Sequence, residues 1–272
     1  MKTLYVSDLD GTLLQPDARL SARTVELLNQ SISKGKLFTV ATARTPATVA
    51  PILEGVDIRL PAIVMTGAAL WNRDSGRYSR VMHMTPDAAG RLLDLYRRME
   101  MPSFIYTLRD DLIHIYHIGE MSELDRSFLE ERIHNPFKRV EEGPLPSPLE
   151  DVILFYAMQP TEKSRAVYEE ARKVEGVRPQ FYHDIFGESI GILEAFSREA
   201  TKAKAMRAMA RQLGADRIVA FGDNVNDLPM MREADLAVAV ENALPEVKEA
   251  ADIVIGPNTA DSVARFIADD PE

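Results

Sequence analysis

The 272-residue chain contains no cysteine. Disulfide bridges and thiolate metal sites are therefore excluded. The chain can bury a large core without such cross-links, because 46% of its residues are apolar. Its length allows one large domain or two ordinary ones.

Positive charge is also scarce. The sequence has 32 lysines and arginines against 42 aspartates and glutamates, which gives a formal net charge of −10. A nucleic-acid backbone or an anionic membrane surface requires a basic face, so we expect neither as the main partner. A small anionic substrate stays compatible, because a local cation or a metal can create a positive pocket in an acidic protein.

Long apolar runs are missing as well. No stretch reaches the roughly 20 apolar residues that a membrane-spanning helix needs. Asp8 and Asp10 interrupt the first apolar stretch, which argues against a signal peptide. We therefore expect a soluble, cytoplasmic protein. The oligomeric state stays open, because the sequence contains no interface signature.

What the sequence does contain is an alternation of short apolar strands and amphipathic helices at both ends of the chain. The N-terminal part predicts strands at 3–7, 37–42 and 62–66, helices at 21–34 and 46–53, and a hairpin over 69–82. The C-terminal part predicts strands at 217–222, 236–240 and 252–255 and helices at 201–213, 226–233 and 244–250. This alternation is typical of an α/β fold with a largely parallel sheet.

The middle of the chain follows another pattern, in which strands come in pairs with helices grouped between them. Strands are predicted on either side of Arg109-Asp110-Asp111 and at 178–183 and 189–196. Such an arrangement is typical of an α+β domain. We therefore predict a Rossmann-like parallel-sheet core formed by residues 1–82 and 191–272, with an α+β domain inserted at 83–190.

Carboxylates follow two of the predicted core strands. Asp8 and Asp10 come directly after the first strand, in the sequence DLDGT, and Asp223 follows strand 217–222. Ligands of open parallel sheets bind outside the carboxyl ends of the strands, so these groups should meet at one edge. Clustered carboxylates repel one another unless a cation lies between them or one is protonated. An all-oxygen ligand set favours Mg²⁺ over Zn²⁺.

A hydroxyl and a cation are expected at the same edge. Thr42 ends the second predicted strand, and Lys202 lies at the start of helix 201–213, where the helix dipole also favours anions. Carboxylates, a hard metal, a lysine and a hydroxyl together describe a site that binds and transfers phosphoryl groups.

Four motifs in this order resemble those of the haloacid dehalogenase superfamily. They are DLDGT at 8–12, Thr42 after an apolar strand, Lys202 at a helix start, and GDNVND at 222–227. They are most similar to the Cof-type phosphatases, in which a large α+β cap is inserted between the second and third motifs. The resemblance implies a Mg²⁺-dependent phosphatase of small phosphorylated metabolites, in which the cap reads the leaving group.

The resemblance also implies a role for each residue. Asp8 would be the nucleophile that forms an aspartyl phosphate, Asp10 would move protons, and Lys202 would orient Asp8. Metal ligation is implied for Asp8, Asp223 and the backbone carbonyl of Asp10. Binding of the phosphoryl group is implied for Lys202, Thr42, Asn226 and the backbone of Leu9 and Ala43. Asp227 would support the metal or the lysine.

The sequence departs from the family pattern in three places. TAR at 42–44 stands where threonine-glycine-arginine is usual, TGA at 66–68 where asparagine-glycine-alanine is usual, and Ala203 where a glycine is usual. None of these changes removes a charged catalytic group, so they concern substrate fit more than activity. Arg44 is expected to form a structural or cap-facing ion pair.

Two other functions stay open. A phosphomutase uses the same chemistry but returns the phosphoryl group to a sugar. A non-catalytic module of the response-regulator kind uses an aspartate beside Mg²⁺ only as a phospho-acceptor. The presence of Asp10, which can hasten hydrolysis, and of the inserted domain favours the phosphatase over such a module.

Overall fold

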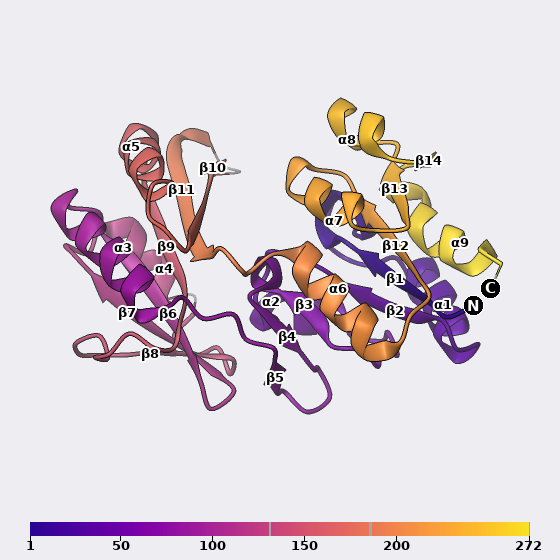
Figure 1. Cartoon of the computed structure of the whole chain (residues 1–272), viewed down its shortest axis with the longest axis horizontal. Coiled ribbons are helices and arrows are strands. Elements are labelled where there is room, and N and C mark those ends of the chain that lie inside the picture. The colour runs from indigo at the N-terminus through magenta and orange to yellow at the C-terminus, as the bar shows by residue number, and fades with distance from the viewer. Residues whose placement is uncertain (131, 185–186, 272) are drawn as a thin grey trace. The chain divides into compact units, whose positions relative to one another are not determined.

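The computed structural model describes residues 1–130, 132–184 and 187–271 (Figure 1). They form two compact units: Met1–Arg80 with Thr201–Glu272, and Val81–Ala200. The boundaries at 80/81 and 200/201 differ from the predicted 82/83 and 190/191, the second because residues 190–197 of β11 (Gly187–Ser197) pair with strands of the second unit. None of the described helices is long and apolar enough to cross a membrane.

The first unit is built on a five-stranded parallel sheet with the order β14–β13–β12–β1–β2. Its strands are β1 (Thr3–Ser7), β2 (Leu37–Val40), β12 (Arg217–Gly222), β13 (Leu236–Val240) and β14 (Ile253–Ile255). Strand β1 lies between β12 and β2 and is buried along its whole length. Burial on both faces explains its mostly apolar sequence. The predicted parallel sheet is confirmed.

Six helices of the described residues accompany the strands of this sheet. They are α1 (Ala22–Ser33), α2 (Pro46–Ile52), α6 (Lys202–Leu213), α7 (Leu228–Arg232), α8 (Pro245–Ala250) and α9 (Ser262–Asp269). Helix α6 packs beside α7, and α1 beside α9 (Figure 1). The Thr201 hydroxyl caps α6 by accepting a hydrogen bond from the Lys204 amide, at 3.1 Å. This cap makes Lys202 the first residue of the helix.

A small antiparallel sheet extends the first unit. It consists of β3 (Ala62–Val64), β4 (Ala69–Trp71) and β5 (Tyr78–Ser79), and it contains the hairpin predicted over 69–82. The prediction that the strand at 62–66 continues to Thr66 is wrong. Met65 and Thr66 have positive φ angles of 50° and 56°, so the chain turns after Val64.

The second unit is built on a six-stranded sheet with the order β10–β11–β9–β6–β7–β8. Its other strands are β6 (Ser103–Arg109), β7 (Leu112–Ile118), β8 (Lys138–Val140), β9 (Val152–Pro160) and β10 (Val177–Asp184). All neighbours are antiparallel except β7 and β8. Strand β8 was not predicted, because its three residues, Lys-Arg-Val, carry no apolar pattern.

Helices cover this sheet too. Tyr96 of α3 (Pro86–Arg98) and Val167 of α5 (Thr161–Ala171) pack in one core with Phe155 and Leu193 of the strands. From α4 (Glu123–Glu130), Phe128 stacks on Tyr156, with ring centroids 5.0 Å apart. Side chains alternate along a strand, so Tyr156 and Phe155 lie on opposite faces. The predicted α+β character of this unit is confirmed.

Candidate active site

The ends of β1 and β12 bring three carboxylates together. Asp8 directly follows β1, and its amide donates to the Phe221 carbonyl of β12 at 3.0 Å. Asp223 directly follows β12, and Asp227 ends a short 3₁₀ turn at 225–227. One carboxylate oxygen from each of Asp8, Asp223 and Asp227 lies within 4.8 Å of the others. The structure thus brings Asp8 and Asp223 together and adds Asp227 to them.

A buried lysine ties two of these carboxylates together. The Lys202 ammonium donates to Asp8 Oδ1 at 2.7 Å and to Asp227 Oδ1 at 2.8 Å. The lysine side chain is only 2% exposed. Such a short, water-excluded pair fixes the Asp8 carboxylate in one orientation.

Gly67 allows α6 to start at this position. Its φ angle is +90°, and a Cβ atom built on it would lie 2.3 Å from the carbonyl oxygen of Thr201. No side chain fits there, so the turn after β3 contacts the backbone at the start of α6 directly. This close approach positions Lys202 opposite Asp8.

Burial dominates the electrostatics of the cluster. It raises the pKa of Asp8 from 3.8 to about 7, against the lowering effect of Lys202 and with a further rise from the charge of Asp227. Burial also raises the pKa of Asp223. Burial would lower the pKa of Lys202, but the charges of Asp8 and Asp227 outweigh it and raise that pKa. One ammonium faces three carboxylates, so a further cation would relieve their repulsion.

Asp223 is held from the other side by the first motif. The Thr12 hydroxyl donates to Asp223 Oδ1 at 2.8 Å. A Cβ atom at Gly11, whose φ is +74°, would lie 2.3 Å from Asp223 Oδ2. A side chain at this position would therefore displace the Asp223 carboxylate, in addition to straining the turn.

The side chain of Asp10 points to a different partner. Arg44 donates from Nε to Asp10 Oδ2 at 2.8 Å and from Nη2 to Asp10 Oδ1 at 2.6 Å. The Asp10 carboxylate does not belong to the cluster of Asp8, Asp223 and Asp227. A role of Asp10 in metal binding would therefore fall to its backbone carbonyl. The ion pair expected of Arg44 is confirmed, and its partner, which the sequence analysis did not name, is Asp10.

The expected phosphoryl-binding residues are differently exposed. Thr42 is fully buried, and its hydroxyl accepts a hydrogen bond from the Arg44 amide at 3.1 Å. The Leu9 amide bonds to the Asp8 carboxylate. Ala43 and Asn226 are exposed. The φ of Ala43 is not positive, so an alanine is conformationally tolerated where the family pattern has glycine.

Two asparagines hold the first motif in place, and the sequence analysis did not predict either of them. Asn242 Nδ2 donates to the Gly11 carbonyl at 2.7 Å, and Asn258 Nδ2 donates to the Leu14 carbonyl at 2.7 Å. The Asn258 amide in turn donates to Asn242 Oδ1 at 2.9 Å. These bonds satisfy carbonyls that the irregular turn after β1 leaves unpaired. Nothing in their local sequence distinguishes them from ordinary turn residues.

The donor set fits a hard divalent cation. Asp8 and Asp223 supply carboxylate oxygens, and no cysteine exists in the chain. Asp227 is already engaged, since its Oδ2 accepts from the amides of Asp223 and Asn224 at 3.3 Å and its Oδ1 from Lys202. Oxygen ligands of this kind are those that Mg²⁺ prefers.

Comparison with known proteins agrees with this geometry. Residues 5–267 match the family of haloacid dehalogenase-like hydrolases. The chain belongs to this family.

Relatives of the chain within the haloacid dehalogenase-like hydrolases are phosphatases by name. A putative phosphatase of Haemophilus influenzae is 27% identical over 266 residues, which cover 96% of this chain and 95% of that protein. The pyridoxal phosphate phosphatase YbhA of Escherichia coli is 26% identical, over 96% of this chain and 95% of that protein.

Solved structures share the fold. A haloacid dehalogenase-like hydrolase from Bacteroides thetaiotaomicron superposes with a TM-score of 0.75 at 23% identity, covering 98% of both chains. A protein from Thermotoga maritima superposes with a TM-score of 0.77 at 23% identity, covering 100% of this chain and 98% of the other. The expected superfamily, the Cof-type resemblance and the enzyme class of a phosphatase are thus confirmed.

Proposed function

We propose that the chain is a Mg²⁺-dependent phosphatase that hydrolyses small phosphorylated metabolites in the cytoplasm through an aspartyl phosphate on Asp8. The observation that carries this proposal is the pairing of Lys202 with Asp8 at 2.7 Å, beside the carboxylate of Asp223. A buried carboxylate fixed by an ammonium, with further carboxylates next to it, suits attack on phosphorus.

The metal requirement rests on the donor set. When bound, Mg²⁺ supplies positive charge that stabilises the phosphoryl oxygens. We assign its ligation to Asp8, Asp223 and the backbone carbonyl of Asp10. Asp227 is assigned to the support of Lys202, because its oxygens already accept hydrogen bonds from that ammonium and from two backbone amides.

In the first step a carboxylate oxygen of Asp8 attacks phosphorus. The bond between phosphorus and the ester oxygen breaks, and Asp10 gives its proton to that oxygen, so the alcohol leaves neutral. In the second step Asp10 takes a proton from water, and the water oxygen attacks phosphorus. The bond to Asp8 breaks, phosphate is released, and both carboxyl groups return to their starting states.

The transferred group needs donors that hold its oxygens. We assign this to the Thr42 hydroxyl, the Lys202 ammonium, the Asn226 side chain and the backbone amides of Leu9 and Ala43. The burial of Thr42 and Lys202 supports their part, because donors in a water-excluded site bind charge more strongly than exposed ones.

The second unit is assigned to recognition of the leaving group. The names of several relatives specify small phosphomonoesters: one acts on pyridoxal phosphate and another on 5-amino-6-(5-phospho-D-ribitylamino)uracil. These names support a substrate of the same class for this chain.

Phosphate release tests the proposal. The chain is incubated with p-nitrophenyl phosphate, pyridoxal phosphate and a panel of sugar phosphates, in Mg²⁺ or in EDTA, beside Asp8→Asn. The expected result is Mg²⁺-dependent release that disappears in the variant. Absence of phosphate from every ester would overturn the proposal, and isomeric sugar phosphates without free phosphate would identify a phosphomutase instead.

A further inference from the structure

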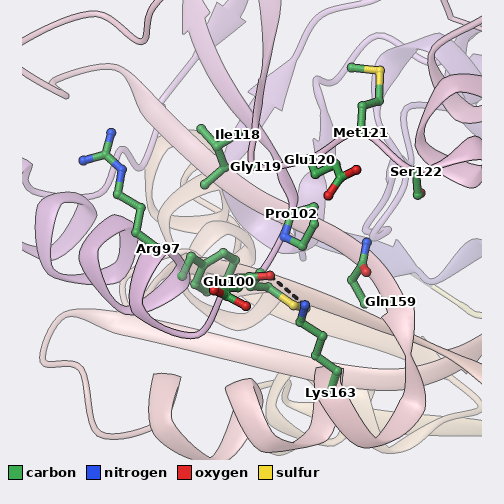
Figure 2. Close-up of a pocket in the computed structure, with 12 residues that line it drawn as sticks. Arg97, Glu100, Pro102, Ile118, Gly119, Glu120, Met121, Ser122, Gln159 and Lys163 are labelled. Atoms are coloured by element: carbon green, nitrogen blue, oxygen red, sulfur yellow. Dashed lines mark hydrogen bonds between the residues drawn. The ribbon is translucent and has the colours of Figure 1, made fainter.

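The second unit contains a cavity of about 830 Å³ (Figure 2). It lies between the C-terminal end of α3, the first turn of α5 and the ends of β6, β7 and β9. Its volume is within the range of pockets that hold small organic ligands. None of the residues assigned to catalysis lines it.

Two polar groups in the wall of this cavity lack a partner. Gln159 is 8% exposed, and its Nε2 finds no hydrogen-bond acceptor among the described residues. Tyr96 is fully buried, and its hydroxyl is likewise without a partner in that part of the chain. Figure 2 shows the Gln159 side chain pointing into the cavity. Buried donors of this kind are normally satisfied, so these two indicate an acceptor that binds from outside.

The same wall carries a positive charge. Lys163 is half-buried and donates from Nζ to the Glu100 carbonyl at 2.6 Å, as the dashed line in Figure 2 shows. An ammonium has three donors, so this bond does not use up its capacity. Helix α5 begins at Thr161, and its N-cap residue, Pro160, provides no side-chain cap. The positive end of the helix dipole therefore lies beside Lys163 and Gln159.

The other charged residues of the wall stand at its rim. Arg97, Glu100 and Glu120 are all exposed, so solvent screens them. Lys163 is thus the one charged side chain of the wall that is not exposed. A single half-buried cation balances one negative charge, which favours a carboxylate over a phosphate dianion.

The rest of the wall is apolar. Met101 is buried, and Pro102, Ile118 and Met121 are half-buried. These side chains would contact the body of a ligand whose charged end lies at Lys163. Methionine adapts its shape to different apolar partners, which suits such a contact.

We propose that this cavity binds a small monocarboxylate with an apolar body, whose carboxylate accepts from Lys163 and Gln159. The ligand is taken as an effector rather than the phosphate ester, because the wall offers one half-buried ammonium and contains none of the residues assigned to the reaction. Binding would give Gln159 Nε2 an acceptor that the described residues do not supply, and would use a further donor of the Lys163 ammonium.

Nuclear magnetic resonance of the full chain tests this proposal. The methionine methyl groups are labelled with carbon-13, and 3-methylbutanoate is added as the probe. The expected result is a saturable shift of the Met101 and Met121 signals, with those of Met206 and Met209 in the first unit unchanged. The neutral amide of the probe is expected to bind at least about tenfold more weakly, because it lacks the charge.

Two lysine variants distinguish binding of the carboxylate at Lys163 from non-specific binding of the probe. Lys163→Met is expected to weaken binding of 3-methylbutanoate by about tenfold or more. Lys173→Met removes an exposed lysine paired with Glu170 and is expected to change nothing. Unshifted methionine signals elsewhere report that both variants are folded.

Four outcomes overturn the proposal. They are the absence of a saturable shift, equal binding of the amide, equal effects of the two lysine variants, and displacement of 3-methylbutanoate by inorganic phosphate. Phosphate release in the absence of the probe is measured in parallel, so failure of this site and failure of the proposed phosphatase are distinguishable.

Discussion

The Arg44 guanidinium donates to both carboxylate oxygens of Asp10, with Nε–Oδ2 at 2.8 Å and Nη2–Oδ1 at 2.6 Å. The Asp10 side chain is 53% exposed and that of Arg44 27%, so the pair adds at most about 1 kcal/mol to stability. Its consequence is geometric, because a two-point contact fixes the direction in which the carboxyl group of Asp10 points. Arg44 is therefore a positioning residue for the group that we assign to proton transfer.

Substitution of Arg44 is expected to affect poor leaving groups more than good ones. An alkyl phosphate needs a proton on its leaving oxygen, whereas p-nitrophenolate leaves without one. In Arg44→Met, kcat/KM for an alkyl phosphate should fall roughly 10- to 100-fold, a part of the usual contribution of general acid catalysis. The value for p-nitrophenyl phosphate should change by less than about threefold.

Arg23→Met serves as the matched control for Arg44, since Arg23 forms an exposed pair with Glu26 in the same unit. It should leave both substrates unaffected. If Arg44→Met lowers kcat/KM for the two esters by the same factor, Arg44 does not act through Asp10.

The buried charge of Asp8 predicts a pH-dependent stability. Its pKa in the folded chain is about 7, above the ordinary 3.8, so its protonated form is favoured by folding. The contribution of Asp8 to the free energy of unfolding is therefore present below pH 4 and is lost as the pH rises through 7. In EDTA, Asp8→Asn should match the unmodified chain near pH 4 and exceed it by roughly 1–4 kcal/mol at pH 8.

Urea denaturation followed by tryptophan fluorescence measures this difference. Trp71 is the only tryptophan of the chain, is 1% exposed and belongs to the first unit. If the difference in free energy of unfolding between Asp8→Asn and the unmodified chain stays constant from pH 4 to pH 8, the burial of the Asp8 charge costs no stability.

Mg²⁺ is expected to stabilise the first unit through Asp223. At a concentration of 100 times its Kd, a ligand that binds only the folded state adds about 2.7 kcal/mol. The same titration of Asp223→Asn should give less than half of this gain. Asp17→Asn, which changes an exposed aspartate of the same unit, should behave like the unmodified chain. Equal gains in all three proteins would exclude Asp223 as a ligand.

Gly67→Ala is expected to disturb the position of Lys202. The added Cβ would lie 2.3 Å from the Thr201 carbonyl oxygen, so the start of α6 must shift. Backbone strain and overpacking together should lower the free energy of unfolding by about 2–5 kcal/mol. The kcat of the folded variant should fall as well, because Lys202 no longer holds Asp8.

Gly76→Ala distinguishes the effect of positive-φ backbone strain from the effect of the clash between the added Cβ and Thr201. Gly76 also has a positive φ, of +69°, but its surroundings are open. This variant should lose only about 1–2 kcal/mol and keep its kcat. If the two alanine variants behave alike, the contact of Gly67 with α6 has no part in the site.

The sequence predicted those parts of the molecule that depend on local pattern. The apolar runs of β1 and β12, and the aspartates that follow them, predict that Asp8 and Asp223 meet at one edge of a parallel sheet, as they do in the structure. Periodicity and strand order suffice for this, because parallel strands end at a common edge.

Contacts between residues far apart in the chain could not be predicted from the sequence. Arg44 and Asp10 are 34 residues apart, and Asn242 reaches Gly11 across 231 residues. The left-handed turn at Met65 and Thr66 was also missed, because β-branched threonine rarely adopts positive φ and tertiary packing overrides that preference here. Contacts of this kind depend on the packed fold and not on local propensity.

Stoichiometric phosphorylation of Asp8 is the most direct test of the central claim. Asp10→Asn should still attack p-nitrophenyl phosphate but hydrolyse the aspartyl phosphate slowly. Rapid mixing with Mg²⁺ should give a burst of about one p-nitrophenolate per chain, and mass spectrometry after acid quenching should locate the phosphoryl group on Asp8. Turnover without a burst, or a phosphoryl group on any other residue, would contradict the assignment of Asp8 as the nucleophile.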